Sequence, residues 1–148
     1  MADSAYTYSV KFVCGIQKDD PEGCLTVRPG TYATEINIHN FKDTVIQIEK
    51  YVLPVVIFGN VVGREPKFTG PQAKDSIELP PNTATMDDCC RISELLLGHP
   101  PLGPSPLTIG FLVIVSSQEL NVTAVYTASD LRSGSISIDV EQIVGKLK

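Results

Sequence analysis

Three polar side chains alternate along one predicted strand and are the first candidates for chemistry. Glu35, Asn37 and His39 fall on the same side of an extended segment, because side chains two residues apart in a strand point to the same face. A carboxylate, an amide and an imidazole together could bind a small ligand or move a proton. One histidine and one carboxylate are too few donors for a metal site, so we predict no metal and no other cofactor. The alternative is a solvated strand face.

Four cysteines are the other residues that could do chemistry. Cys14 and Cys24 flank a polar loop and could face each other as a disulfide, whereas Cys89 and Cys90 are adjacent. Neither spacing matches the paired C-x₂₋₄-C ligands of a zinc site. Free cysteine is among the residues most often buried, so we expect all four to pack as small apolar side chains. A Cys14–Cys24 disulfide, which would require an oxidising compartment, is the alternative.

The chain lacks the sequence motifs of the large enzyme classes. It contains only two histidines, His39 and His99, and no nucleophile elbow, HExxH, Walker or dinucleotide-binding pattern. We therefore predict that the protein is not an enzyme. An enzyme of unknown type is the third of the three functional hypotheses, after the two non-catalytic ones given below.

Composition limits the class of protein. A chain of 148 residues with 43% hydrophobic residues can bury a core, and we predict one domain over residues 1–148. The net charge of −5 argues against a nucleic-acid surface, which needs clustered lysine and arginine. No apolar run approaches the length of a membrane-spanning helix. The amino terminus does not resemble a signal peptide, so we expect a cytoplasmic protein, or an extracellular one if a leader has been removed.

Alternation of apolar and polar residues predicts several β-strands with one solvated face each. The pattern is clearest in four segments: Tyr6–Cys14, Tyr32–His39, Glu119–Tyr126 and Ser135–Glu141. Leu107–Ser117 is apolar on both faces, which is typical of a central strand covered on both sides. Pro54 interrupts a further long apolar run and indicates an edge, a bulge or a break there.

One short helix is predicted near residues 88–97. Asp87 or Asp88 can cap its start, and Gly98 with Pro100 ends it. Several strands, one short helix and no alternation of strands with helices predict an all-β fold. We expect an antiparallel β-sandwich or a jelly-roll-like barrel.

Four segments carry a distinctive order of motifs: Lys11–Gly15, Pro29–Asn40, Gly110–Ala128 and Ser135–Ile143. They resemble the segments KFVCG, PGxYxTxINVHNP, GFVVIxSxxELDVVAVYT and SIDVE, which occur in this order in a family of small uncharacterised bacterial β-rich proteins. The resemblance covers most of the chain except the loops at 63–75 and 98–106. It implies a bacterial origin, but it implies no activity because the family has none assigned. The chain departs from the family at HNFK, where members more often have HNP.

An uncharged apolar segment suggests the function. Tyr51–Gly63 carries no charge, whereas natural edge strands are usually protected by charged residues. We predict a non-catalytic structural or binding protein that self-associates into a homo-oligomer or filament, with other copies of itself as its partner. The expected interface residues are Tyr51, Val52, Val55, Val56, Ile57 and Phe58. Alternatively, the segment is the centre of the sandwich. The second functional hypothesis is a module that binds a small ligand or carbohydrate through Glu35, Asn37 and His39.

Overall fold

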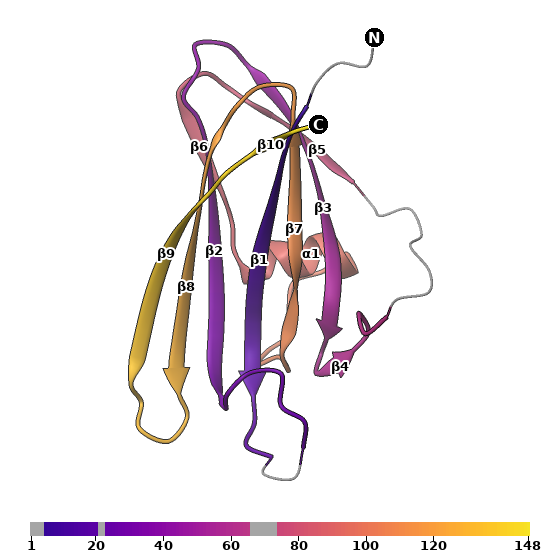
Figure 1. Cartoon of the computed structure of the whole chain (residues 1–148), viewed down its shortest axis with the longest axis vertical. Coiled ribbons are helices and arrows are strands. Elements are labelled where there is room, and N and C mark those ends of the chain that lie inside the picture. Colours follow the sequence, from indigo (N-terminus) through magenta and orange to yellow (C-terminus); the bar gives the residue numbers. More distant parts are fainter. Residues whose placement is uncertain (1–4, 21–22, 66–73) are drawn as a thin grey trace.

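The computed structural model describes residues 5–20, 23–65 and 74–148. Ten strands and one helix lie within these ranges (Figure 1). In chain order they are β1 (Tyr6–Gln17), β2 (Gly30–Asn40), β3 (Ile46–Ile57), β4 (Asn60–Val61), β5 (Asp75–Leu79), β6 (Thr83–Asp87), α1 (Cys89–Leu97), β7 (Thr108–Ser116), β8 (Asn121–Asp130), β9 (Ile136–Ile143) and β10 (Lys146–Leu147). The all-β prediction is confirmed.

The strands are hydrogen-bonded in the order β4-β3-β7-β1-β2-β8-β9, and every pair of strands is antiparallel. Three short strands attach beside this path: β5 pairs with β3, β6 with β2, and β10 with β1. The central strand of the set, β1, pairs with β7 over residues 6–14 and with β2 over residues 15–17. It therefore belongs to two sheets, which separate from each other toward the top of the view, starting from the lower end of β1 (Figure 1).

Gly15 lies where β1 changes partner. Its φ of +104° is one that residues with a side chain rarely adopt. A Cβ atom at this position would lie 2.5 Å from the carbonyl oxygen of Pro106. The close approach of the two backbones therefore requires glycine.

The core lies between the sheets and follows from the predicted alternation. Tyr8, Val10 and Phe12 of β1 are at most 1% exposed, whereas Ser9 and Lys11 between them are exposed. The other large fully buried side chains are Ile36, Ile38, Ile46, Ile48, Ile92, Leu107, Leu112, Ile114 and Val122. The inward faces of β1, β2, β3 and β7 thus form one continuous apolar layer.

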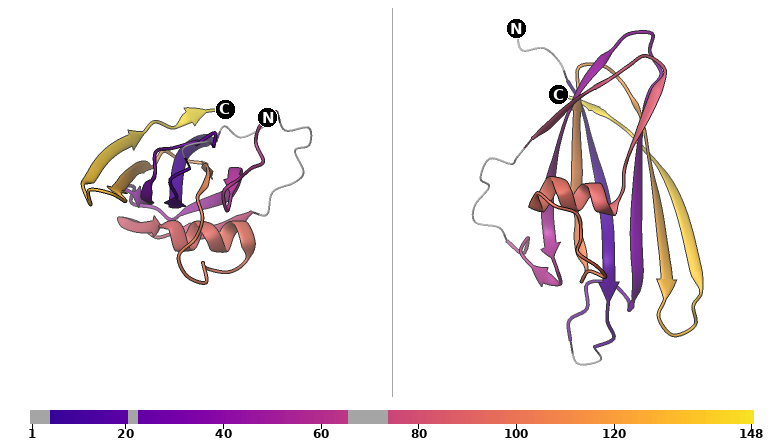
Figure 2. Two further views of the ribbon diagram at one scale, coloured as in Figure 1. Left: turned by 90° about the horizontal axis from the view of Figure 1, so that it is seen from below. Right: turned by 180° about the vertical axis from the view of Figure 1, so that it is seen from behind.

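The helix α1 forms a separate layer against the strands and contacts β2, β3 and β6 (Figure 2). At its start the Asp88 carboxylate accepts a hydrogen bond from the Arg91 backbone N–H at 2.9 Å. At its end Gly98, with φ +84°, donates its N–H to the Glu94 carbonyl oxygen at 2.8 Å. Ile92 enters the core. The predicted helix is confirmed, with Asp88 rather than Asp87 as its N-cap and with its predicted end at Gly98.

Two other strand predictions are confirmed. The strand β7 lies between β1 and β3, and Leu112, Val113 and Ile114 are all buried. The pairing of β3 with β7 shifts between Pro54 and Val56, which is the irregularity that the proline predicts.

The strand β9 differs from its expected half-buried state. Its apolar residues Ile136, Ile138 and Val140 are 73%, 67% and 62% exposed. They share the outer face of the sheet with Thr127 and Val125 of β8. Since β9 ends the strand order, it has a sheet neighbour on one side only among the described residues (Figure 1). Alternation shows that apolar side chains share a face, but not that something covers that face.

Within the described ranges, no helix has the length and apolarity needed to cross a membrane.

Candidate functional site

A disulfide joins Cys14 of β1 to Cys89 at the start of α1. The two Cα atoms lie 5.8 Å apart, although the residues are 75 positions apart in the sequence. The predicted Cys14–Cys24 pair is therefore wrong, because the sulfur of Cys14 is already bonded to Cys89. Cys24 and Cys90 are free and exposed, so the expectation that they pack in the core is also wrong.

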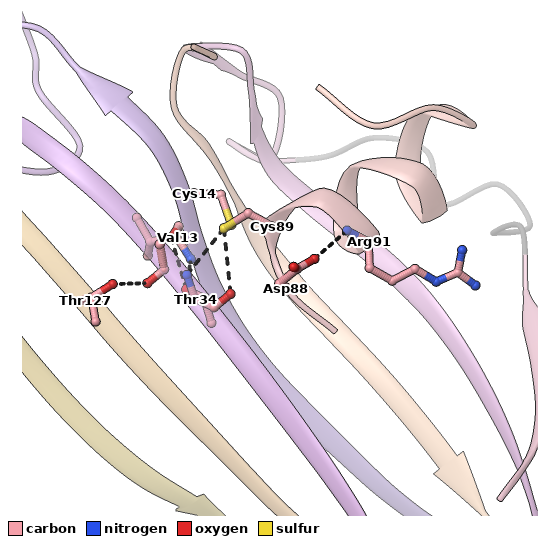
Figure 3. The surroundings of a disulfide bond; sticks show 8 residues. Val13, Cys14, Thr34, Asp88, Cys89, Arg91 and Thr127 are labelled. Atoms are coloured by element: carbon pink, nitrogen blue, oxygen red, sulfur yellow. Dashed lines mark hydrogen bonds between the residues drawn. A yellow bond between two sulfur atoms is a disulfide. The ribbon is translucent and has the colours of Figure 1, made fainter. Parts of the chain in front are cut away.

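Thr34 of β2 connects the two sheets beside this disulfide (Figure 3). Its hydroxyl accepts a hydrogen bond from the Val13 N–H at 2.9 Å and donates one to the Val13 carbonyl at 3.0 Å. The Thr34 N–H points to the Cys89 sulfur at 3.4 Å. Buried Thr34 thus satisfies backbone groups where β1 changes partner, and it holds the two strands and the disulfide in one cluster.

A cavity of about 310 Å³ opens beside the disulfide. Its walls come from β1, α1, the turn after β3, the loop before β7 and the first residue of β7, and Cys14, Cys89 and Cys90 all contribute to them. None of the 15 lining residues is aspartate, glutamate, lysine, arginine or histidine. Phe12, Ile92, Leu96 and Pro106 give it an apolar interior.

Phe58 lines the same cavity from an unusual backbone position. Its φ is +47°, which is rare for a bulky residue. The Phe58 N–H donates to the Thr108 hydroxyl at 3.3 Å, and the Gly59 N–H donates to the Leu107 carbonyl at 2.7 Å. These bonds hold the turn after β3, and the Phe58 side chain remains 39% exposed. Such backbone strain is concentrated at functional sites in many proteins.

The polar trio of β2 lies on the exposed outer face, as the alternation predicted. The Asn37 amide donates to the Glu35 carboxylate at 3.0 Å, and this bond does not extend to His39. Glu35 and His39 are exposed. The trio therefore forms a row on an open sheet, and its role in binding a ligand stays a prediction.

The segment predicted as an interface is partly buried within the chain. Val52 and Val56 belong to the buried core. Tyr51, Val55 and Ile57 are half-buried, and Phe58 is exposed. Two of the six predicted residues are thus already covered, as the alternative interpretation of a sandwich strand requires.

A buried ion pair was not anticipated from the sequence. The Lys50 ammonium of β3 lies 2.9 Å and 3.1 Å from the two carboxylate oxygens of Asp87 in β6. Asp75 approaches the same ammonium at 3.9 Å and also binds Arg91 at 2.8 Å. The sequence did contain a signal for a buried lysine. Lys50 follows Ile46 and Ile48 at two-residue spacing, so it falls on the buried face of β3.

The inner face of β9 is polar and looks toward β1. Asp139 lies opposite Tyr126 of β8, and both line a hollow with Glu141 and Lys11. Burial of its hydroxyl, together with the nearby Glu141 carboxylate, raises the pKa of Tyr126 to about 12. The two faces of β9 are therefore chemically distinct, with carboxylates on one and aliphatic side chains on the other.

No family model, curated protein or solved structure matches this chain.

The cysteine arrangement predicts the outcome of a thiol titration. Without reductant, native protein should label rapidly at Cys24 and Cys90, because both are exposed. Cys14 and Cys89 should label only after reduction, even in denaturant. Peptide mass spectrometry after alkylation identifies each site. Labelling of Cys14 in unreduced, unfolded protein would contradict the disulfide.

Proposed function

We propose that this protein is a non-catalytic β-sandwich that forms a homodimer through the free edge of β9. The observation that carries the proposal is an eight-residue edge strand with three exposed aliphatic side chains in alternation. An open edge offers unpaired N–H and C=O groups to another strand. A second copy presents the same edge, so antiparallel pairing about a two-fold axis satisfies both chains at once.

Charge and the pairing of the three aliphatic side chains together select the register of this pairing. A pair centred on Asp139 would place the Asp139 side chains of the two copies opposite each other. A pair centred on Val140 would place Asp139 opposite Glu141. Like charges directly opposite are destabilising. A pair centred on Ile138 avoids both clashes: it joins Ile138 to Ile138, and Ile136 to Val140.

The same register gives the carboxylate face suitable partners. Asp139 then lies opposite Ser137, whose hydroxyl can donate a hydrogen bond to a carboxylate. Packing the outer sheet faces against each other is disfavoured, because it would bury the Glu35 carboxylate without a counter-charge and would remove the His39 imidazole from water. Edge pairing leaves these side chains in water and makes one sheet continuous across the dimer.

The disulfide supports the proposal that the protein is located in an oxidising compartment. Structural disulfides persist in secreted and periplasmic proteins and are rare in the cytosol of mesophiles. This part of the proposal replaces the cytoplasmic default. Trapping thiols with iodoacetamide in intact cells of the source would test it, because a cytosolic protein would carry four alkylated cysteines.

The dimer is tested by placing a charge at its centre. Ile138→Lys puts two ammonium groups opposite each other, and we expect the dimer to weaken by about tenfold or more. Val45→Lys is the matched control, because Val45 is 53% exposed and directly precedes β3, which lies near the opposite end of the strand order from β9. Sedimentation equilibrium should show monomeric Ile138→Lys and dimeric Val45→Lys, with the β circular-dichroism signal unchanged in both. A monomeric wild-type protein at micromolar concentration would refute the proposal.

Cross-linking tests the register separately. In a Cys24→Ser/Cys90→Ser background, Ile138→Cys should form an intermolecular disulfide under mild oxidation, because opposite Cα atoms in antiparallel strands lie about 4.5–5.5 Å apart. Asp139→Cys should not, because the two copies of residue 139 are then offset by two residues along the strands, which places their Cα atoms about 8 Å apart, beyond the ~7 Å limit. Efficient cross-linking of Asp139→Cys alone would show a dimer with a different register.

A further inference from the structure

We propose that the cavity beside the Cys14–Cys89 disulfide binds a small, neutral, largely hydrocarbon molecule. The site is separate from β9, because its walls come from β1, α1, the turn at Phe58 and the loop before β7. Cys90 of α1 supplies a free thiol in its wall.

The volume of the cavity limits the size of the ligand. Its 310 Å³ lies near the lower end of the range for small-molecule pockets, about 300–1,000 Å³. An apolar cavity of about 150 Å³ already admits benzene. The volume therefore suits one or two fused rings or a short acyl chain.

The chemistry of the walls limits the charge of the ligand. The lining contains no charged side chain or histidine, so an ionised ligand would lose its hydration without gaining an ion pair. Two lining hydroxyls are already occupied, since Ser93 donates to the His99 carbonyl at 3.0 Å and Ser105 donates to the Gly103 carbonyl at 3.2 Å. A peptide would bring several backbone donors and acceptors and find few partners. The walls thus match a neutral molecule with at most one or two polar atoms.

Phe58 and the disulfide give the cavity fixed walls. The positive φ of Phe58 is maintained by the hydrogen bonds to Thr108 and Leu107. On the other side, the covalent link between Cys14 and Cys89 holds α1 against β1. A cavity whose walls are fixed before binding loses less conformational entropy when a ligand enters.

Cys90 and Cys24 together allow a direct test. Both thiols are free and exposed, but Cys24 is not among the residues that line the cavity. We would measure alkylation of each by iodoacetamide in the presence of indole, p-xylene or 1-octanol. At about ten times its dissociation constant, a bound probe should slow the reaction of Cys90 about tenfold and leave Cys24 unchanged. Indole-3-carboxylate, a charged analogue, should give no protection.

Variants that fill the cavity complete the test. Ser93→Trp or Ser105→Trp should abolish protection by indole, whereas Ser117→Trp, an exposed replacement outside the cavity, should retain it. Two filling variants are used so that one which fails to fold does not end the test. The Ile138→Lys monomer should behave as wild type, so failure of the dimer leaves this result intact. The inference is overturned if no neutral probe protects Cys90, if the carboxylate protects equally, or if both folded filling variants keep protection.

Discussion

Replacing Lys50 by methionine is expected to lower the free energy of unfolding by about 3–5 kcal/mol. Lys50 and Asp87 are only 2% and 1% exposed, and the ammonium contacts both carboxylate oxygens. The substitution leaves the Asp87 carboxylate in the core without its main counter-charge. Since small domains have about 5–15 kcal/mol in total, the loss is a large fraction of their stability. Urea denaturation followed by circular dichroism measures it.

Two further variants test whether the loss of stability comes from the unpaired Asp87 carboxylate. The double variant Lys50→Met/Asp87→Leu removes both charges and should recover most of the loss, because apolar residues can replace a buried ion pair at little cost. Glu49→Gln is the matched surface control: Glu49 pairs with Lys74, both side chains are more than half exposed, and such pairs contribute about 0–1 kcal/mol. A Lys50→Met protein as stable as this control would contradict the account.

Removing the disulfide by Cys14→Ala/Cys89→Ala should lower the free energy of unfolding by about 4 kcal/mol. The link joins residues 75 positions apart, so it excludes many extended conformations from the unfolded state. The urea dependence of the unfolding free energy should also steepen, because the unlinked chain exposes more surface when it unfolds.

The chain contains its own control for this experiment. Cys24→Ser/Cys90→Ser removes the same number of cysteines at exposed positions and should change stability by less than about 1 kcal/mol. Wild-type protein held in reductant should match the Cys14→Ala/Cys89→Ala variant to within the effect of the lost side-chain volume. Equal stability of the two double variants would show that the disulfide does not stabilise the fold.

Local signals in the sequence were enough to predict the six long strands and the helix, but not the short strands β4, β5, β6 and β10. The alternation around Tyr8, Val10 and Phe12 reflects the period of a strand, which depends only on near neighbours. The helix cap at Asp88 and the bulge after Pro54 have local causes in the same way. These features did not depend on knowing which strands pair.

Features that join distant segments could not be predicted in this way. The cysteine nearest to Cys14 in sequence is Cys24, but the fold brings Cys89 to it by placing α1 against β1. The ion pair joins Lys50 and Asp87, which lie 37 positions apart. The cavity likewise depends on how α1 packs against the loop before β7. The sequence of either segment alone does not predict this packing.

The position of β1 has a consequence for how the protein is made on the ribosome. This first strand pairs along most of its length with residues 108–116, and its first residues pair with Leu147 and Lys146. Synthesis proceeds at about 5–20 residues per second. The apolar face of β1 therefore waits on the order of ten seconds before its main partner exists. During this interval the nascent chain exposes an aggregation-prone strand, so its yield should depend on chaperones that bind unfolded segments until synthesis is complete.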